Sequence, residues 1–225
     1  MSDEVHLTGM VLSSVPYAEY DRRIILLTRE RGKITAFAKG ARKPTSALLA
    51  AAGVFHFGDF TLYEGRNAYT LAGASISRYF SGVREDLDKS LLASYFMELA
   101  GYYGRENLDA KDMLNLLYVT LGALEQGKMD LRLIRYIFEI RLIAINGEYP
   151  VQVAGDETLD PSTRYTLTYI LQAPLQKLYA FTVNEKVLTE ITALQERLRP
   201  RIIDMRLKSL EILEQMQPHS CNTGL

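Results

Sequence analysis

Residues 29–43 read Arg-Glu-Arg-Gly-Lys-Ile-Thr-Ala-Phe-Ala-Lys-Gly-Ala-Arg-Lys, with six of the 26 basic residues of the chain and a single acidic one. Within this stretch, hydrophobic and polar side chains alternate with a period of two, which is typical of a β-strand with two different faces. One face carries Lys33, Thr35, Phe37 and Lys39, and the other carries Ile34, Ala36 and Ala38. The small apolar side chains of the second face are those that the inside of a small barrel requires.

The first face of this strand places an aromatic ring between two positive charges. Phe37 stands between Lys33 and Lys39, and residues 40–44 continue the charge into a loop with Arg42 and Lys43. A ring in this setting can stack on a base while the cations neutralise the phosphates beside it. The pattern therefore indicates nucleic-acid binding. An exposed strand whose lysines only confer solubility is the alternative.

The charge is uneven along the chain, although the net charge is only −1. Residues 1–80 hold ten Lys and Arg against seven Asp and Glu, whereas residues 81–225 hold sixteen against twenty. An anionic partner is thus expected to bind the first third of the chain, mainly at residues 22–43.

The first 80 residues have the strand order of an OB-fold barrel. Turn residues such as Pro16, Gly32 and 64–67 separate short runs with strand character. We predict five strands, at Val5–Ser14, Tyr20–Thr28, Lys33–Lys39, Val54–Tyr63 and Ala68–Ser77, with a short helix at Ser46–Ala52 between the third and the fourth.

A helical pattern replaces the strands after a domain boundary near residues 78–84. Asp86 and Asp109 are expected N-caps, Asp160-Pro161 starts a further helix, and Thr182-Val-Asn-Glu185 is a capping box. The predicted helices are Asp86–Tyr103, Asp109–Gln126, Leu131–Ile145, one from Asp160, one from 182 to about Arg199 where Pro200 breaks it, and Arg201–Gln215. The predicted fold class is α+β, with a five-stranded OB-fold barrel at 1–80, an all-α helical domain at 81–217 and a flexible tail at 218–225.

The helix predicted at Leu131–Ile145 is mostly apolar, which places it at the centre of a bundle. Arg132, Arg135 and Glu139 share one stripe of this helix. Arg141 lies on the opposite side and therefore needs a partner or an opening to solvent.

Several classes of chemistry have no support in the sequence. His6, His56 and His219 are scattered and the one cysteine, Cys221, is near the end, so neither a metal site nor an internal disulfide is expected. No phosphate-binding glycine loop, nucleophile motif or membrane-length apolar run is present. Tyr17, Tyr20 and Tyr63 are expected to be packing residues. The expectation is a non-enzymatic cytoplasmic protein without cofactors.

Several of these segments together resemble the RecO family of bacterial recombination mediators. The most specific part is Thr28-Arg-Glu-Arg-Gly-Lys33 running into Ala36-Phe-Ala-Lys-Gly-Ala-Arg42. Weaker parts are Gly9-Met-Val-Leu12, Glu19-Tyr-Asp21, Ser94-Tyr-Phe-Met-Glu-Leu99, Asn146-Gly-Glu-Tyr-Pro150 and Leu207-Lys-Ser209.

The resemblance implies an OB domain followed by a helical domain, in the order predicted above. It also implies binding of single- and double-stranded DNA, annealing of complementary strands, and loading of RecA onto strands coated by single-strand-binding protein, with RecR as the partner, in the cytoplasm at the nucleoid. Many members carry a four-cysteine zinc module after the segment that matches 146–150. Here residues 151–220 contain no cysteine, so zinc is not expected.

The expected mechanism places DNA across the basic face of the barrel. Phe37 would stack on a base while Lys33, Lys39, Arg42 and Lys43 neutralise phosphates, with Arg22, Arg23, Arg29 and Arg31 as second-rank candidates. In the helical domain, the candidates for meeting the acidic tail of single-strand-binding protein are Arg132, Arg135, Arg201 and Arg206, with ordinary surface arginines as the alternative. Two other functions stay open, a protein-interaction scaffold and an RNA-binding accessory protein.

Overall fold

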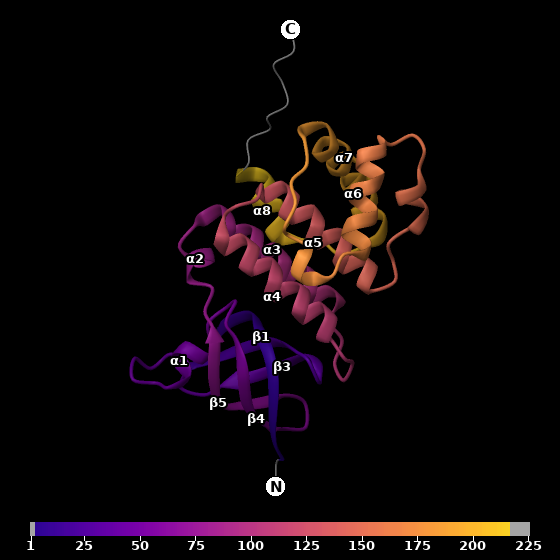
Figure 1. The fold of residues 1–225 in the computed structure, drawn as a ribbon. Helices are drawn as coiled ribbons and strands as arrows, with labels where there is room; N and C mark the ends of the chain where they lie inside the picture. Colours follow the sequence, from indigo (N-terminus) through magenta and orange to yellow (C-terminus); the bar gives the residue numbers. More distant parts are fainter. Residues whose placement is uncertain (1–2, 217–225) are drawn as a thin grey trace.

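The computed structural model describes residues 3–216, and its N-terminal strands form a closed barrel (Figure 1). The strands are β1 (Glu4–Tyr17), β2 (Asp21–Thr28), β3 (Gly32–Ala38), β4 (Phe57–Glu64) and β5 (Tyr69–Arg78), and the short helix α1 (Leu48–Ala51) lies between β3 and β4. Their order around the barrel is β1-β2-β3-β5-β4, and β4 pairs with β1 to close it. This is the OB-fold order, so the predicted fold class is confirmed.

The alternating pattern of β3 explains how it takes its place in the barrel. Ile34, Ala36 and Ala38 point inward and are at most 1% exposed. They join a core that includes Leu7 of β1, Ile24 of β2 and Phe60 of β4. The residues between them point outward and are only partly buried.

The rest of the described chain is helical. It comprises α2 (Ser81–Arg84), α3 (Leu87–Tyr103), α4 (Lys111–Gln126), α5 (Leu131–Ile145), α6 (Pro161–Gln172), α7 (Glu185–Ile202) and α8 (Lys208–Met216), with 3-10 turns at Val151–Gly155 and Leu175–Lys177. Helix α5 is central as predicted, because it contacts α3, α4, α6 and α7 and its residues from Leu133 to Ile140 are all buried. The predicted tail, 218–225, lies outside the described residues.

Arg141 of α5 finds the partner that the sequence required. Its guanidinium donates to the carbonyl oxygens of Ile170 and Ala173, each at 3.1 Å, and to that of Leu171. These carbonyls belong to the last turn of α6 and the residue after it, where a helix leaves carbonyl groups without internal partners and favours a positive charge.

The C-terminal helices differ from the prediction in three respects. Helix α7 continues through Pro200 to Ile202, because a proline in the last turn removes only one helix bond and the Ile203 N–H still donates to the Arg199 carbonyl at 2.8 Å. Asn184, and not Thr182, caps α7. Helix α8 begins at Lys208 because the carboxylate of Glu98, on α3, accepts the N–H groups of Lys208 and Ser209 at 3.0 and 2.8 Å.

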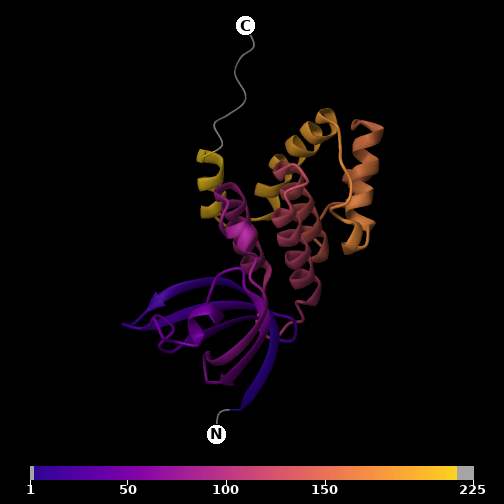
Figure 2. The ribbon, with the colours of Figure 1, turned by 60° about the vertical axis from the view of Figure 1, so that its left-hand side comes forward.

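A second hydrophobic core joins the barrel to the helical domain. Met10, Leu12 and Leu27 belong to the barrel strands, yet they cluster with buried residues of the helices such as Phe96 and Ala100. Helix α3 lies against β1, and Figure 2 shows it descending onto the barrel. The backbone joins the two parts as well, since the Lys33 N–H donates to the Arg105 carbonyl at 3.1 Å.

A glycine at this junction gives a test of how tightly the two parts fit. Gly32 has a φ of +63° and an added Cβ would overlap the carbonyl oxygens of Arg105 and Leu108. Gly147 has a φ of +76° but open space around it. We expect Gly147→Ala to lower the free energy of unfolding by about 1 kcal/mol through backbone strain alone, and Gly32→Ala by on the order of 3 kcal/mol. Urea unfolding of the two variants checks this, and equal losses would contradict the close fit.

His56, beside the start of β4, makes stability depend on pH. Its Nδ1 donates to the Ala50 carbonyl at 2.6 Å and its Nε2 accepts from Arg84 at 3.1 Å, so the ring is neutral. Burial lowers the pKa of His56 below its ordinary value and Arg84 lowers it further, against an opposing effect of the Ala50 hydrogen bond. The stabilisation is therefore present above pH 6.5 and lost as the pH falls through the lowered pKa.

We expect the free energy of unfolding to decrease from pH 7 toward pH 5 less steeply in His56→Asn than in the wild type. His6→Asn is the matched control, because the side chain of His6 is 70% exposed. Urea unfolding over this pH range checks the prediction, and an unchanged slope in His56→Asn would contradict it.

Candidate nucleic-acid interface

The outer face of β1, β2 and β3 is divided into a covered half and a free half. At the covered end, the ammonium of Lys33 donates to the Gly101 carbonyl of α3 at 2.6 Å, and an added Cβ at Gly104 would come within 2.9 Å of Lys33 Cβ. At the free end lie Phe37 and its neighbours. Any ligand of the barrel face must therefore approach from the Phe37 end.

Two aromatic rings lie side by side on the free half. Phe37 pairs across the sheet with Arg23, which in turn pairs with Val15. The Tyr17 and Phe37 ring centroids are 4.7 Å apart with a 49° angle between the planes, and Tyr17 is 51% exposed. The two rings therefore present apolar surface beside the guanidinium of Arg23.

The loop after β3 brings three further cations to the same end. Lys39, Arg42 and Lys43 are exposed. The Arg42 N–H donates to the Tyr20 carbonyl at 2.8 Å and its side chain donates to the Glu19 carbonyl at 3.1 Å. These bonds tie the loop to the β1–β2 turn.

Two more contacts fix this loop. The N–H of Gly40, whose φ of +67° suits glycine, donates to the Asp21 carboxylate at 2.7 Å. The Lys43 ammonium lies 5.4 Å from the centre of the Tyr20 ring. We call Tyr17, Tyr20, Arg23, Phe37, Lys39, Arg42 and Lys43 together the basic aromatic face.

The cations of this face form no ion pairs within the part of the chain that the structure describes. Among the described residues, no carboxylate lies within ion-pair distance of Arg23, Lys39, Arg42 or Lys43. Cations without partners next to exposed rings are the groups that bind a phosphate backbone and its bases.

Four other predicted DNA-contacting residues are not part of the basic aromatic face. Lys33 is bound to α3, and its pKa is lowered by burial and then by Arg105, so we remove it from the basic aromatic face. Arg29 and Arg31 lie at the β2–β3 turn, where their carbonyls accept from Ala110 and Asn107 of the helical part. Arg31 also pairs with Glu64 at 3.6 Å. Arg22 donates to the Ser14 hydroxyl at 3.2 Å and lies next to the face.

Tyr17 and Tyr20 are contributors that sequence reasoning missed. Both were expected to pack in the barrel, but they are 51% and 46% exposed beside the cations. The neighbouring sequence Asp21-Arg22-Arg23 was the signal from which their position beside cations could have been predicted. Tyr63 is also 40% exposed, but it lies on β4, where it pairs with Glu4 of β1.

The four predicted partner-binding arginines of the helical domain differ in availability. Arg132 pairs with Asp130 at 2.9 Å and Glu185 at 3.0 Å, and Arg206 pairs with Glu211 at 2.6 Å. Arg201 is exposed, and no ion pair of it is found in the part of the chain that the structure describes.

Arg135 is a buried structural residue, contrary to its expected place on the surface. Its side chain is 8% exposed and donates to the fully buried Glu139 at 2.9 Å. Glu139 also accepts from the Tyr95 hydroxyl at 2.7 Å and lies 3.8 Å from Arg199. Removing one partner of such a buried pair would leave an uncompensated charge, so the cluster fixes how α3, α5 and α7 pack.

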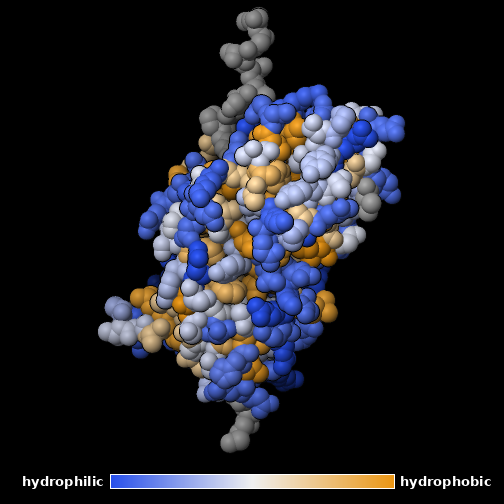
Figure 3. Space-filling view, in the orientation of Figure 1, coloured by the Kyte–Doolittle hydropathy of each residue, from blue (hydrophilic) through white to orange (hydrophobic). Residues whose placement is uncertain are grey.

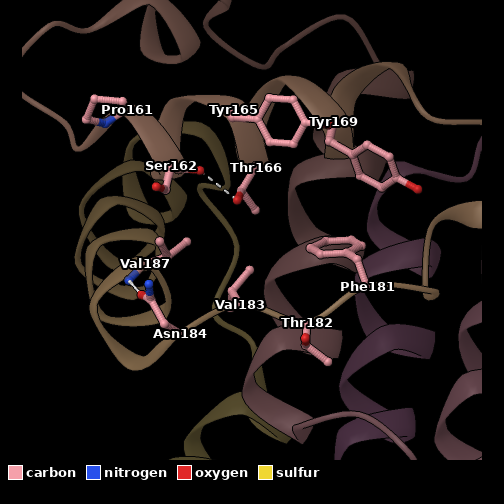
Figure 4. A pocket seen from close by; sticks show the side chains of 10 residues that line it. All are labelled: Pro161, Ser162, Tyr165, Thr166, Tyr169, Phe181, Thr182, Val183, Asn184 and Val187. Carbon is pink, nitrogen blue, oxygen red and sulfur yellow. Dashed lines mark hydrogen bonds between the residues drawn. The ribbon is translucent and has the colours of Figure 1, made fainter.

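The helical domain has an aromatic pocket of about 560 Å³ between α6 and the segment before α7 (Figure 4). The Tyr169 and Phe181 rings meet edge to face, with centroids 5.0 Å apart, and Tyr165 is 73% exposed. The pocket lining contains no Lys or Arg, so its chemistry suits an apolar side chain and not a phosphate backbone.

Two other kinds of site are not found in the part of the chain that the structure describes. Within residues 3–216, no three His, Cys, Asp or Glu side chains are grouped as metal binding would require. In the same range, no helix has the length and apolar character to cross a membrane. On the side shown in Figure 3, hydrophilic side chains cover much of both the barrel and the helices, with small hydrophobic patches between them.

Comparison with known proteins relates both parts of the chain to one family. The family model described as "Recombination protein O N terminal" matches residues 1–80, and "Recombination protein O C terminal" matches residues 84–154. Three similar proteins, each named DNA repair protein RecO, come from Alkaliphilus metalliredigens, Acetivibrio thermocellus and Bacillus subtilis.

The similarity covers different shares of these relatives. The Alkaliphilus and Bacillus proteins are 35% and 32% identical over 63% of this chain, and the match spans only 58% and 55% of their own lengths. The Acetivibrio protein is 25% identical over 95% of this chain and 98% of its own length. With the closed barrel, the helical part and two matching family models, the chain belongs to the RecO family.

Proposed function

We propose that this chain is a DNA-binding recombination mediator that acts without catalysis. The observation that carries the proposal is the basic aromatic face, in which four cations without ion pairs accompany the exposed ring of Tyr17 and the half-buried ring of Phe37. Strands 2 and 3 of an OB barrel commonly present such a face to oligonucleotides. The names of the similar proteins, which refer to DNA repair, support the same function.

Binding by this face follows from simple interactions. Guanidinium and ammonium groups neutralise phosphates and release counterions, while the rings stack on bases of any identity. Binding of single- and double-stranded DNA should thus tolerate any sequence and weaken steeply with salt. Annealing needs no catalytic group, because it requires only that the repulsion between two strands be screened while they meet.

The proposed partners are RecR and the acidic tail of single-strand-binding protein, with RecA loaded onto the released strand. The helical domain is the proposed docking part. Arg201 is the remaining exposed arginine candidate, while the aromatic pocket at Tyr165 could take apolar side chains of a partner. That pocket also favours the second candidate function, a protein-interaction scaffold.

Removing the loop charges should weaken DNA binding. We expect Lys39→Ala/Arg42→Ala/Lys43→Ala to lower the affinity for single-stranded DNA at least tenfold at low salt. The slope of log Kd against log salt should fall by about 2, since each lost phosphate contact on a single strand is worth about 0.7. Fluorescence anisotropy across a salt series measures both quantities.

The matched control for this experiment is Lys111→Ala/Lys128→Ala/Arg197→Ala, which removes three exposed charges from α4, the loop after it, and α7. The control should keep most of the affinity and the full slope. An equal loss in both triple variants would show that only net charge matters and would contradict a defined face.

Removing the central ring should weaken binding in a different way. Phe37→Ala is expected to cost about 1–3 kcal/mol of binding free energy with no change in salt slope, because stacking involves no counterion release. Phe37→Tyr should bind as the wild type does. The control is Tyr63→Ala, which removes an exposed ring on β4. A similar loss of binding free energy in this variant would contradict the assignment of stacking to Phe37.

A further inference from the structure

A groove of about 750 Å³ lies between the barrel and the helical domain, next to the basic aromatic face. Its barrel side is formed by Leu12, Ser13 and Ile25, and its helical side includes Tyr102 of α3 and Ile212 of α8. Ile212 is 47% exposed, so the groove is open to solvent.

The groove begins where the basic aromatic face ends. Ile25 pairs with Ser13 on one side and Thr35 on the other, and this row of residues is adjacent to the row of Val15, Arg23 and Phe37. The two rows are separated by two residues along each strand, which is a step of about 7 Å. A strand stacked on Phe37 needs only this step to enter the groove.

The groove is also positively charged. Lys33, Arg105 and Lys208 line it, and within the described residues none of the three forms an ion pair with a carboxylate. Glu98 also lines the groove and keeps its negative charge while it accepts the backbone N–H groups that start α8, so three cations face one carboxylate in the lining. Burial lowers the pKa of Lys33, and Arg105 lowers it further, as expected for two cations near each other.

We propose that this groove is a second binding segment, in which the helical domain holds the continuation of the nucleic-acid strand that lies on the barrel. Arg105 and Lys208 contact its phosphates, while Tyr102 and Ile212 offer apolar surface to its bases. The inference rests on the proposed function. It adds that the helical domain is part of the nucleic-acid path and that the site is longer than the barrel face.

Charge and continuity select this occupant over a protein segment. An apolar peptide would gain nothing from the exposed cations Arg105 and Lys208, whereas a polyanion neutralises them. The aromatic pocket on α6 has apolar lining without this charge and lies in a different part of the helical domain.

The test compares binding of a short and a long oligothymidine. About 4 nucleotides suffice for the barrel face, while about 12 can also reach the groove, both within the range of one OB-fold. The first variant, Arg105→Ala/Lys208→Ala, removes two positive charges. The second, Ile212→Glu, adds a negative charge that opposes them. All three positions are exposed. The matched control is Lys177→Ala/Arg197→Ala, two exposed cations outside the groove lining. Lys33 is left in place because it holds the junction.

The expected result is a loss of affinity for the long oligonucleotide alone. Arg105→Ala/Lys208→Ala should lower it about tenfold and lower its salt slope by about 1.4, with the short oligonucleotide and the control variant unaffected. An unchanged ratio of long to short affinity in both groove variants would overturn the inference and leave the groove to a protein partner. In that case the proposed function still holds if the Lys39/Arg42/Lys43 variant binds the short oligonucleotide more weakly than the wild type does. If the Lys39/Arg42/Lys43 variant binds both oligonucleotides as tightly as the wild type does, the proposed function is contradicted instead.

Discussion

The packing of α3 against β1, and of α4 against β2, is the contact on which the rest of the molecule depends. Leu12 and Leu27 would be exposed strand residues in an isolated barrel, but here they are 6% and 0% exposed in a core shared with the helices. Burial of apolar side chains at such a junction stabilises both parts together. It also determines which half of the barrel face is left for a ligand.

This constraint gives the binding face a direction. With the Lys33 end closed by Gly101 and Gly104, the free cations collect at the Phe37 end, where the β1–β2 turn and the β3–α1 loop are bonded to each other. The groove beside α8 is the remaining path along the sheet. The same helix that closes one end of the face therefore forms a wall for the strand that would leave it.

The sequence predicted what local patterns determine and missed what tertiary contacts determine. The strand and turn pattern of residues 1–80 was sufficient for the barrel order, and the caps at Asp86 and Asp160 were sufficient for the starts of α3 and α6. The start of α8 depends on Glu98, which is more than a hundred residues away in sequence, so no local signal could reveal it.

The candidate site shows the same division. Phe37 and the loop cations could be predicted from alternation and charge, and in the structure the cations are exposed while Phe37 is half-buried against Tyr17. The bond of Lys33 to α3 could not be predicted, because its position on the strand is equivalent to that of Phe37 by alternation. Likewise, the burial of Arg135 depends on α7 and α8 closing over α5.

Ultraviolet cross-linking of single-stranded DNA to the intact chain, followed by mass spectrometry of the linked peptides, tests the central claim most directly. The account predicts cross-links at Tyr17, Tyr20 and Phe37, on the free half of the barrel face. Cross-links confined to the aromatic pocket around Tyr165 and Tyr169, with none on the barrel, would contradict it.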